Sequence, residues 1–217
     1  MANRPIYHAI TKPPFYEAIH VDFQFYSGFS LSQKQKCIKS LHEAYLNRYP
    51  DRNVLEISSK STINLGISLS AFNLTLTNDT KTFSVECAFQ GSKVFENGGP
   101  YIDLFDKTSR EAKKDERLKT SGALTQFQYF NNSYPLEPKD LFYNWLYINA
   151  LSQNKELAEQ LLCYDSFSDI EFNPQKSINC QAKAAAAFVG LSTKHILSEA
   201  LSSNENFLKL VYGKCLT

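Results

Sequence analysis

Three polar side chains recur along one otherwise apolar segment, and their functional groups suit acid–base and nucleophilic chemistry. The stretch SVECAFQGSKVF, residues 84–95, predicts a helix in which Glu86, Gln90 and Lys93 fall at i, i+4 and i+7 on one face. On an ordinary surface helix such residues form a solvated face with an ion pair. Here the remaining positions are apolar or small on more than one side, and burying lone polar groups is costly unless they are paired or used. The pattern therefore favours the wall of a cleft.

A cleft would also change the reactivity of the amine. Partial desolvation disfavours the charged form, so we expect it to lower the pKa of Lys93 and keep a fraction of the amine neutral. A neutral amine is a nucleophile, and a nearby carboxylate such as Glu86 can move protons.

A second polar cluster lies much later in the chain, in YDSFSDIEFNPQKSINCQAKAAAAF. Asp and Asn residues alternate there with two phenylalanines: Asp165, Phe167, Asp169, Glu171, Phe172, Asn173 and Asn179. One interpretation is a loop of turn-forming residues followed by a helix that begins at Ser177 or Asn179. The other is a ligand-binding loop that aims a helix N-terminus at an anion such as a diphosphate. Spacing alone leaves both open.

Two compact positive features complete the set of candidate residues. Lys60 lies in SSKS, and Lys113 and Arg117 are at i, i+4 in the charged segment TSREAKKDERLKT, residues 108–120. They form either ordinary surface charge or contacts to a diphosphate or a DNA backbone.

The elements that must position these residues are mixed strands and helices without a regular βαβ rhythm. Residue patterns predict strands over 4–10, 16–26, 54–61, 66–76 and 123–130, with a turn at 77–80. They predict helices over 30–49, 84–95, 108–120, 137–151, 154–164 and 180–191, and a last one over 198–211. In the first helix, Ser30 and Gln33 have capping-box spacing. We therefore expect one α+β domain over residues 1–217, mostly helical around a small β-sheet.

Composition narrows the class of protein. With 23 basic and 22 acidic residues, the net charge of +1 neither demands nor excludes a nucleic-acid partner. No apolar run approaches the ~20 residues of a membrane span, and the N-terminus lacks a signal-peptide core, so we expect a cytoplasmic protein without a membrane partner. The five cysteines form no CxxC pair, which favours reduced thiols. The four histidines are isolated from one another and from cysteine, so we expect neither a metal site nor a cofactor.

Several blocks of the sequence resemble one known family. The motif S-x-E-x-x-F-Q-x-x-K, which begins at Ser84, resembles the signature helix of the NADAR, or YbiA-like, family. LSAFNL (69–74), EAKKDERL (111–118), INALSQNKELAEQLL (148–162) and the D-x-x-F-N…N pattern from Asp169 are similar to further family blocks. This core of resemblance covers about residues 65–190, after an N-terminal β/α extension. LEISSKS, FQGSKVFENGGPYIDLF and FYNWLYINAL are similar to strings of one branch, the NADAR antitoxins encoded beside DarT-type DNA ADP-ribosyltransferase toxins.

The resemblance implies an N-glycosyl hydrolase that removes ADP-ribose from guanine bases in DNA and acts as the antitoxin to a DarT-type toxin. Its partners would be ADP-ribosylated DNA, the ADP-ribose product and the toxin. The implied catalytic residues are Glu86, Lys93 and Asp169. The implied substrate-binding residues are Lys60, Ser70, Phe72, Asn73, Phe89, Gln90, Lys113, Arg117, Phe172, Asn173 and Asn179.

Two chemical routes are open for such a reaction. Glu86 and Lys93 would lie about 10 Å apart along a helix axis, so both long side chains could lean towards a ligand between them. In the favoured route, Lys93 attacks C1 of an opened ribose to form a Schiff base, with Glu86 or Asp169 as the acid–base. In the other, a carboxylate activates water and Lys93 is only an electrostatic contact.

The chain also departs from the family pattern. Cys87 replaces a histidine that is common after the signature glutamate, and Phe172 and Asn173 replace a tryptophan–glycine pair. These differences argue against a riboflavin-pathway substrate and for the ADP-ribosyl-guanine branch. Two alternative functions are an N-glycosidase that acts on a free nucleotide metabolite and a non-catalytic protein that binds the toxin or a nucleotide.

Overall fold

The computed structural model describes residues 1–78 and 81–214. Its first ten elements are β1 (Ala2–Ala9), β2 (Tyr16–Phe23), α1 (Leu31–Leu46), β3 (Val54–Glu56), α2 (Asn64–Ser68), β4 (Thr75–Asn78), β5 (Lys81–Ser84), α3 (Val85–Gly91), β6 (Lys93–Phe95) and the 3-10 helix η1 (Ile102–Asp106). The others are α4 (Ser109–Lys114), α5 (Arg117–Thr120), β7 (Leu124–Tyr129), β8 (Asn132–Tyr134), α6 (Leu141–Gln153), α7 (Lys155–Leu161), β9 (Ser166–Ser168), α8 (Gln181–Thr193), α9 (Leu197–Leu201) and α10 (Asn204–Tyr212). The α+β class predicted from the sequence is confirmed.

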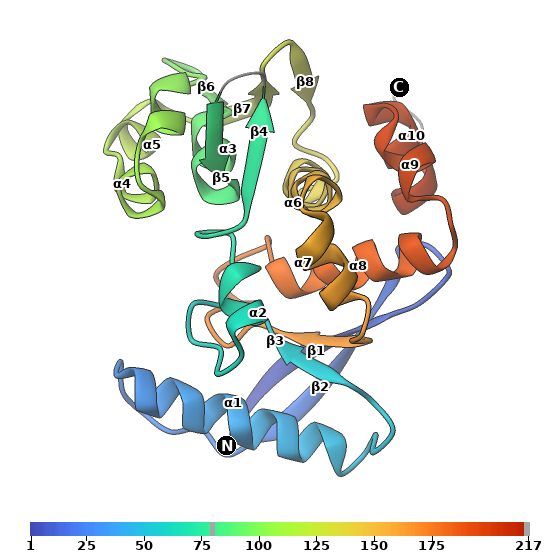
Figure 1. The fold of residues 1–217 in the computed structure, drawn as a ribbon. Coiled ribbons are helices and arrows are strands. Elements are labelled where there is room, and N and C mark those ends of the chain that lie inside the picture. The colour runs from blue at the N-terminus through green and yellow to red at the C-terminus, as the bar shows by residue number, and fades with distance from the viewer. Residues whose placement is uncertain (79–80, 215–217) are drawn as a thin grey trace.

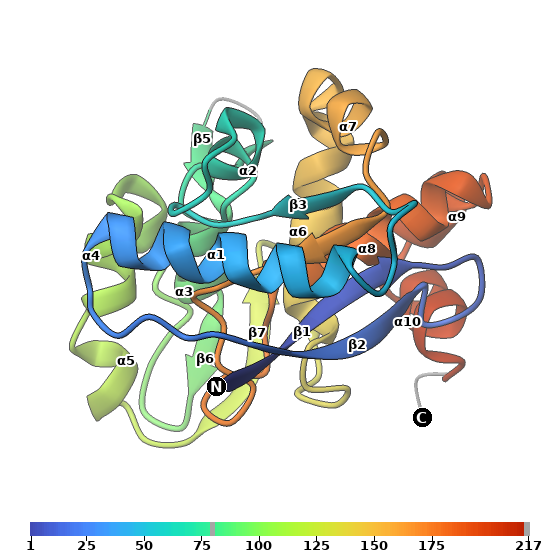
Figure 2. The same ribbon diagram turned by 90° about the horizontal axis from the view of Figure 1, so that it is seen from below.

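The largest sheet joins the start of the chain to its later part. Its strand order is β2-β1-β9-β3, with β1 antiparallel to β2 and β9 parallel to β3. Helix α1 lies across one face of this sheet (Figure 2). Its buried stripe of Cys37, Ile38, Leu41 and Tyr45 packs in one cluster with apolar residues of β1 and β2. Because β9 and β3 are neighbouring parallel strands, both end at the same edge of the sheet. The residues that follow them therefore start from that edge.

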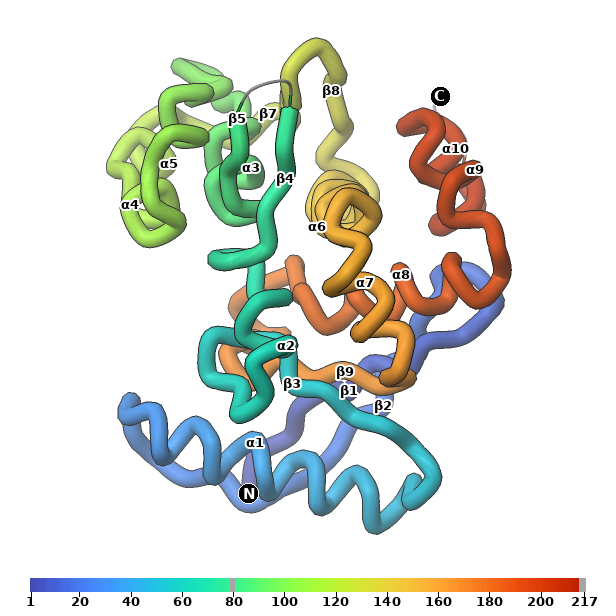
Figure 3. The backbone as a smooth tube through the Cα atoms, in the orientation of Figure 1, coloured from blue at the N-terminus to red at the C-terminus, as the bar shows by residue number. Residues whose placement is uncertain are grey.

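The main core lies on the other side of this sheet. Helix α8 runs between the sheet and α6, and both helices are buried along most of their length (Figures 1 and 3). The small residues of α8 allow close approach: a Cβ on Gly190 would lie 2.3 Å from the backbone oxygen of Ile10. This packing fixes α8 between the sheet and α6.

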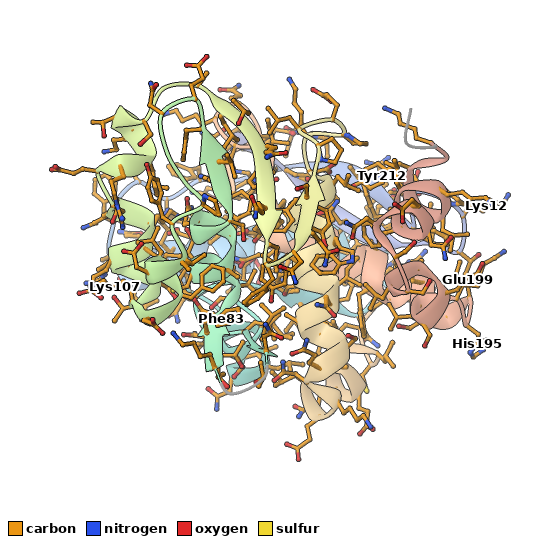
Figure 4. All side chains as sticks on the ribbon, turned by 90° about the horizontal axis from the view of Figure 1, so that it is seen from above. Lys12, Phe83, Lys107, His195, Glu199 and Tyr212 are labelled. Atoms are coloured by element: carbon orange, nitrogen blue, oxygen red, sulfur yellow. The ribbon has the colours of Figure 1, made fainter. Side chains whose placement is uncertain are left out.

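The part of the fold that carries α3 is built on two smaller sheets. Strands β4 and β5 form a hairpin, β6, β7 and β8 form an antiparallel sheet, and α3 follows β5 without a linker (Figure 1). Phe89 of α3 packs against Phe127 and Phe142, with ring centroids 5.3 and 6.1 Å away. Phe83 of β5 is buried as well, whereas Figure 4 shows charged side chains such as Lys12 and Lys107 at the periphery of the molecule.

Several predicted element boundaries are wrong for local reasons. The segment 84–95 is not one helix, because α3 ends at Gly91 and Lys93 begins β6, which pairs with β7. The segment 108–120 divides at Asp115, whose carboxylate accepts a hydrogen bond from the backbone N–H of Arg117. The helix predicted over 198–211 is likewise two helices, since Ser203 caps the second.

Two predicted strands are also shorter than expected. In residues 54–61 only β3 is extended, because the Ser58 hydroxyl bonds to Glu56 and to the backbone of Lys60 and turns the chain. In residues 66–76 the first part belongs to α2 and a turn, where the side chains of Ser70 and Asn73 bond to the carbonyl of Ile67. The turn predicted at 77–80 includes residues 79–80, which lie outside the described residues.

The remaining predicted helices are present in the structure, although their ends differ by a few residues. Ser30 caps α1 by accepting a hydrogen bond from the backbone of Gln33. Helix α8 starts at Gln181, later than the predicted starts at Ser177 or Asn179. Cys37, Cys87, Cys163 and Cys180 are free thiols, and Cys215 lies outside the described residues. Across residues 1–78 and 81–214, no helix has both the length and the apolar character that crossing a membrane requires.

Candidate active site

A cavity of about 610 Å³ opens where α3, α6 and the ends of β3 and β9 meet. Its walls come from distant parts of the chain: the turn after β3, the turn after α2, helices α3, α4 and α6, and the segment between β9 and α8. The lining residues are Ser58, Ser59, Lys60, Ser70, Ala71, Phe72, Glu86, Phe89, Gln90, Arg110, Lys113, Tyr143, Asp169, Glu171, Phe172, Ser177, Asn179 and Gln181. Both polar clusters noted in the sequence therefore meet at one cavity.

Helix α3 holds Glu86 and Gln90 in the cavity wall. Ser84 caps the helix, and the backbone N–H of Glu86 bonds to the carbonyl of Ala71 at 2.9 Å. Glu86 and Gln90 are only 6% and 7% exposed, which excludes a solvated helix face. Glu86 Oε1 accepts a hydrogen bond of 2.9 Å from Gln90 Nε2 and lies 3.8 Å from Lys113 Nζ. The buried carboxylate is thus bonded on one side and faces a cation on the other.

Lys93 lies next to this pair although it is not on the helix. Its amine donates a 2.7 Å hydrogen bond to Gln90 Oε1 and lies 4.9 Å from the centre of the Phe89 ring. Burial lowers the pKa of Lys93, the Glu86 charge opposes this effect and the Lys113 charge adds to it. The Gln90 amide therefore links the amine to the Glu86 carboxylate, and Lys93 stands beside the residues that line the cavity.

Asp169 enters from the wall formed by the segment between β9 and α8. It directly follows β9, and its Oδ1 accepts hydrogen bonds from the backbone N–H groups of Glu171 and Phe172, at 3.0 and 3.2 Å. Burial, together with the charge of Glu56, raises the pKa of Asp169 well above its usual range. A carboxyl group of this kind can hold a proton at neutral pH and deliver it to a leaving group.

The mouth of the cavity combines cations with aromatic surface. Lys60, Arg110 and Lys113 line it, and Lys113 Nζ lies 5.1 Å from the centre of the Phe72 ring. Phe72 is 37% exposed, unusual for a large apolar side chain. Further in, Asn179 has a buried side-chain oxygen that accepts no hydrogen bond from the residues that the structure describes. These groups offer charge to an anion, a flat ring to a base and an unused acceptor to a ligand donor.

Four of the residues expected at the site do not line the cavity. Besides Lys93, they are Asn73, Arg117 and Asn173. Asn73 and Asn173 use their side chains in local turns, to the carbonyl of Ile67 and the N–H of Gln175. Arg117 is paired with Asp103 and Asp115, at 2.7 and 2.9 Å, and no longer shares a helix with Lys113.

Sequence reasoning missed several cavity residues. Gln181 ties two walls together, since it accepts from the N–H of Ala71 and donates to the carbonyl of Ile57. Tyr143 packs edge-on against Phe89, and burial, reinforced by the Glu86 charge, raises its pKa well above the usual value, so it is a neutral phenol. The sequence did contain a signal for Tyr143, because a tyrosine hydroxyl within the apolar run of α6 needs a hydrogen-bond partner once it is buried. The other missed residues are Ser58, Ser59, Ala71 and Arg110, whereas Glu171 and Ser177 belong to the polar loop already noted in the sequence.

One family of known proteins matches the chain over almost its entire length. The family model described as "DarT1-associated NADAR antitoxin" matches residues 2–217. No curated protein matches the chain significantly. The family match spans the N-terminal strands and α1 as well as the cavity.

Proposed function

The chain belongs to the DarT1-associated NADAR antitoxin family, and on that premise we propose that it is an N-glycosyl hydrolase that removes ADP-ribose from guanine bases in DNA. In this role it reverses the modification made by a DarT-type toxin. The observation that carries the proposal is the meeting of Glu86, Gln90 and Asp169 at one cavity with a cationic mouth, with Lys93 bonded to Gln90 beside the cavity.

The cavity supports binding of an ADP-ribosyl group. Its volume falls within the roughly 300–1,000 Å³ of small-molecule sites. Two phosphates need cations or N–H donors, and Lys60, Arg110 and Lys113 supply positive charge at the mouth. The partly exposed ring of Phe72 offers a stacking surface to adenine or guanine.

The two carboxyl groups, Glu86 and Asp169, support cleavage of the bond between guanine and ribose C1. As that bond breaks, its electron pair stays on the guanine nitrogen, which takes a proton, while C1 becomes electron-poor. Asp169 supplies the proton, and Glu86 places a negative charge beside C1. Water then adds its oxygen to C1 and returns one proton to the carboxylate, so that ADP-ribose and unmodified guanine are formed.

The lysine route reaches the same products through one additional intermediate. When the ribose ring opens, C1 is joined to the guanine nitrogen as an imine; the Lys93 amine adds to C1, and the guanine nitrogen leaves with the protons that the amine gives up. One water then hydrolyses the new imine between Lys93 and C1, which frees the amine and ADP-ribose. In the structure the amine is bonded to Gln90 and would have to turn from this partner towards the cavity. Its lowered pKa supports this route because it increases the fraction of neutral amine.

The test is multiple turnover on a defined substrate. A single-stranded oligonucleotide with one ADP-ribosylated guanine is supplied in 100-fold excess over the protein. We expect release of ADP-ribose and recovery of unmodified DNA by mass spectrometry, with many substrate molecules processed per protein. Release that stops at one equivalent would contradict catalysis, and cleavage of free ADP-ribosyl-guanosine alone would contradict the DNA substrate.

A further inference from the structure

Glu56 is a buried carboxylate that the proposed reaction does not use. It is the last residue of β3, is 2% exposed, and pairs in register with Ser168, the residue before Asp169. It stands directly behind the cavity wall formed by Ser58 and Asp169.

Three hydrogen-bond donors converge on Glu56. Its Oε1 accepts from Ser58 Oγ at 2.7 Å and from the backbone N–H of Ile170 at 2.8 Å. Its Oε2 accepts from Ser168 Oγ. Since all three groups donate, the site is built for the charged carboxylate rather than for the neutral acid.

Asp169 has weaker support for a negative charge. Both of its hydrogen bonds, from Glu171 and Phe172, go to Oδ1, and no described residue bonds to Oδ2. Burial raises the pKa of both Glu56 and Asp169, but the donors on Glu56 oppose the effect and the charge of Glu56 adds to it at Asp169. When two carboxyl groups share a desolvated region, the less well solvated one keeps the proton.

We propose that Glu56 is the positioning residue of the site: its fixed charge keeps the proton on Asp169 and so makes Asp169 the acid of the reaction. This inference rests on the proposed glycosyl hydrolase function. In it, Glu56 touches no substrate. As the bond to C1 breaks, the proton passes from Asp169 to the guanine nitrogen, and the water that adds to C1 returns a proton to Asp169. Glu56 remains charged throughout and disfavours the ionised form of its neighbour.

The hydrogen bonds continue from Glu56 to the outer helix of the sheet. His42 of α1 places Nε2 2.8 Å from Ser168 Oγ. Burial lowers the pKa of His42 to about 4, so its ring is neutral at pH 7. Because Ser168 donates its proton to Glu56, the neutral ring must donate from Nε2. The N-terminal helix thus orients the serine that holds the Glu56 charge.

Other titratable groups lie around Glu56 and Asp169, on the elements that pack against these two residues. Asp169 interacts electrostatically with groups on β1, α6, the start of α8 and its own loop: Tyr7, Tyr143, Tyr147, Cys180 and Glu171. Burial raises the pKa of Tyr7, Tyr143, Tyr147 and Cys180, which keeps them neutral near pH 7. Glu171 is bonded to Lys34 at 2.8 Å, which offsets its charge. Among these groups, Glu56 is the buried charge that acts on Asp169.

The test measures the titration of Asp169 directly, by carboxyl-carbon NMR of protein labelled in aspartate, with Asp169→Asn assigning the signal. Glu56→Gln is close to isosteric: its carbonyl can accept from Ser58 and Ile170, and its amide can donate to Ser168, which then donates to His42. We expect the titration midpoint of Asp169 to fall by about one pH unit or more, because a neighbouring charge is removed. An unchanged midpoint would overturn the proposal.

Two further variants guard against a purely structural effect. Ser168→Ala removes one hydrogen-bond donor from Glu56, so Glu56 should be protonated in a larger fraction of the molecules. The titration midpoint of Asp169 should then fall, but by less than in Glu56→Gln. If Glu56→Gln does not fold, Ser168→Ala takes its place as the test. An unchanged Asp169 midpoint in Ser168→Ala would also contradict the proposal. Glu43→Gln removes an exposed carboxylate from α1 next to His42 and should leave the midpoint unchanged.

Activity separates this proposal from the function on which it rests. With the substrate oligonucleotide, Glu56→Gln should shift the alkaline limb of the pH–rate profile to lower pH, because Asp169 loses its proton earlier. The NMR titration needs no substrate. A shifted midpoint in a protein that releases no ADP-ribose would therefore contradict the hydrolase alone, and release with an unshifted midpoint would contradict the role of Glu56 alone.

Discussion

Replacing Lys93 by arginine separates the two chemical routes. Lys93 donates to Gln90 at 2.7 Å and lies 4.9 Å from the Phe89 ring. A guanidinium keeps the positive charge and can donate to the same amide oxygen, but it cannot form an imine. The substitution thus removes nucleophilicity while it preserves most of the electrostatic contact.

The structure sets the size of effect that each route predicts. If Lys93 is only an electrostatic contact, misplacing its hydrogen bond to Gln90 costs about 1–2 kcal/mol, or roughly 5- to 30-fold in rate. If Lys93 forms the covalent intermediate, its loss should reduce the rate by roughly 10⁴-fold or more, as expected for a nucleophile. The two ranges do not overlap.

The assay combines single-turnover release of ADP-ribose with borohydride reduction. For the covalent route we expect wild-type protein to gain one ADP-ribosyl adduct at Lys93, and Lys93→Arg to lose both adduct and turnover. The rate should rise with pH through a midpoint below the ~10.4 of a free lysine, because burial lowers the pKa of Lys93 and deprotonation creates the nucleophile. Lys119→Arg, on the exposed surface of α5, is the matched control. A rate for Lys93→Arg within about 30-fold of wild type would refute the covalent route and leave water activated by Glu86 or Asp169.

Three other substitutions test the geometry of the site. Lys113→Ala should weaken binding to modified DNA and reduce the magnitude of the slope of log K against log salt concentration by about 1. Arg117→Ala should change this slope less, because Arg117 is already paired with two aspartates. Equal slopes for the two variants in binding titrations would contradict this expectation. Tyr143→Phe should raise KM about 3- to 10-fold if the phenol bonds to the ligand, and unchanged steady-state kinetics would remove it from the site. Gly91→Ala should destabilise the fold by about 1–3 kcal/mol in urea unfolding, since its Cβ would lie 2.5 Å from Phe105 Cε1, and wild-type stability would show that the ring can move freely.

The sequence predicted which polar residues lie together at a cavity better than it predicted the elements that carry them. Glu86 and Gln90 were expected on the wall of a cleft because lone polar residues stood in an apolar segment, and that reasoning needs only a few residues of helix. The end of α3 at Gly91 was not visible, because Lys93 joins a strand whose partner β7 comes some 30 residues later. Periodicity within one segment cannot report a pairing made so far away.

Residues that act from behind the cavity wall were the hardest to find. Glu56 looked like an ordinary polar position in a predicted strand, and its role depends on β9, over 100 residues away. Asn73 and Arg117 were expected at the site, yet nearby turns and ion pairs engage their side chains. Composition and spacing could not separate polar groups that serve the local backbone from those that serve a ligand.

We propose that Glu86 takes part in the chemistry at this cavity rather than in binding alone. The most direct measurement pairs turnover with ADP-ribose affinity for Glu86→Gln, which keeps an acceptor for the Gln90 amide. We predict a fall in turnover of roughly 10²- to 10³-fold with affinity within a few-fold of wild type, because the Glu86 charge stabilises C1 mainly as it becomes electron-poor in the transition state. Glu116→Gln, an exposed carboxylate between α4 and α5, should change neither quantity. Wild-type turnover in Glu86→Gln, or an equal loss of affinity and turnover, would contradict the account.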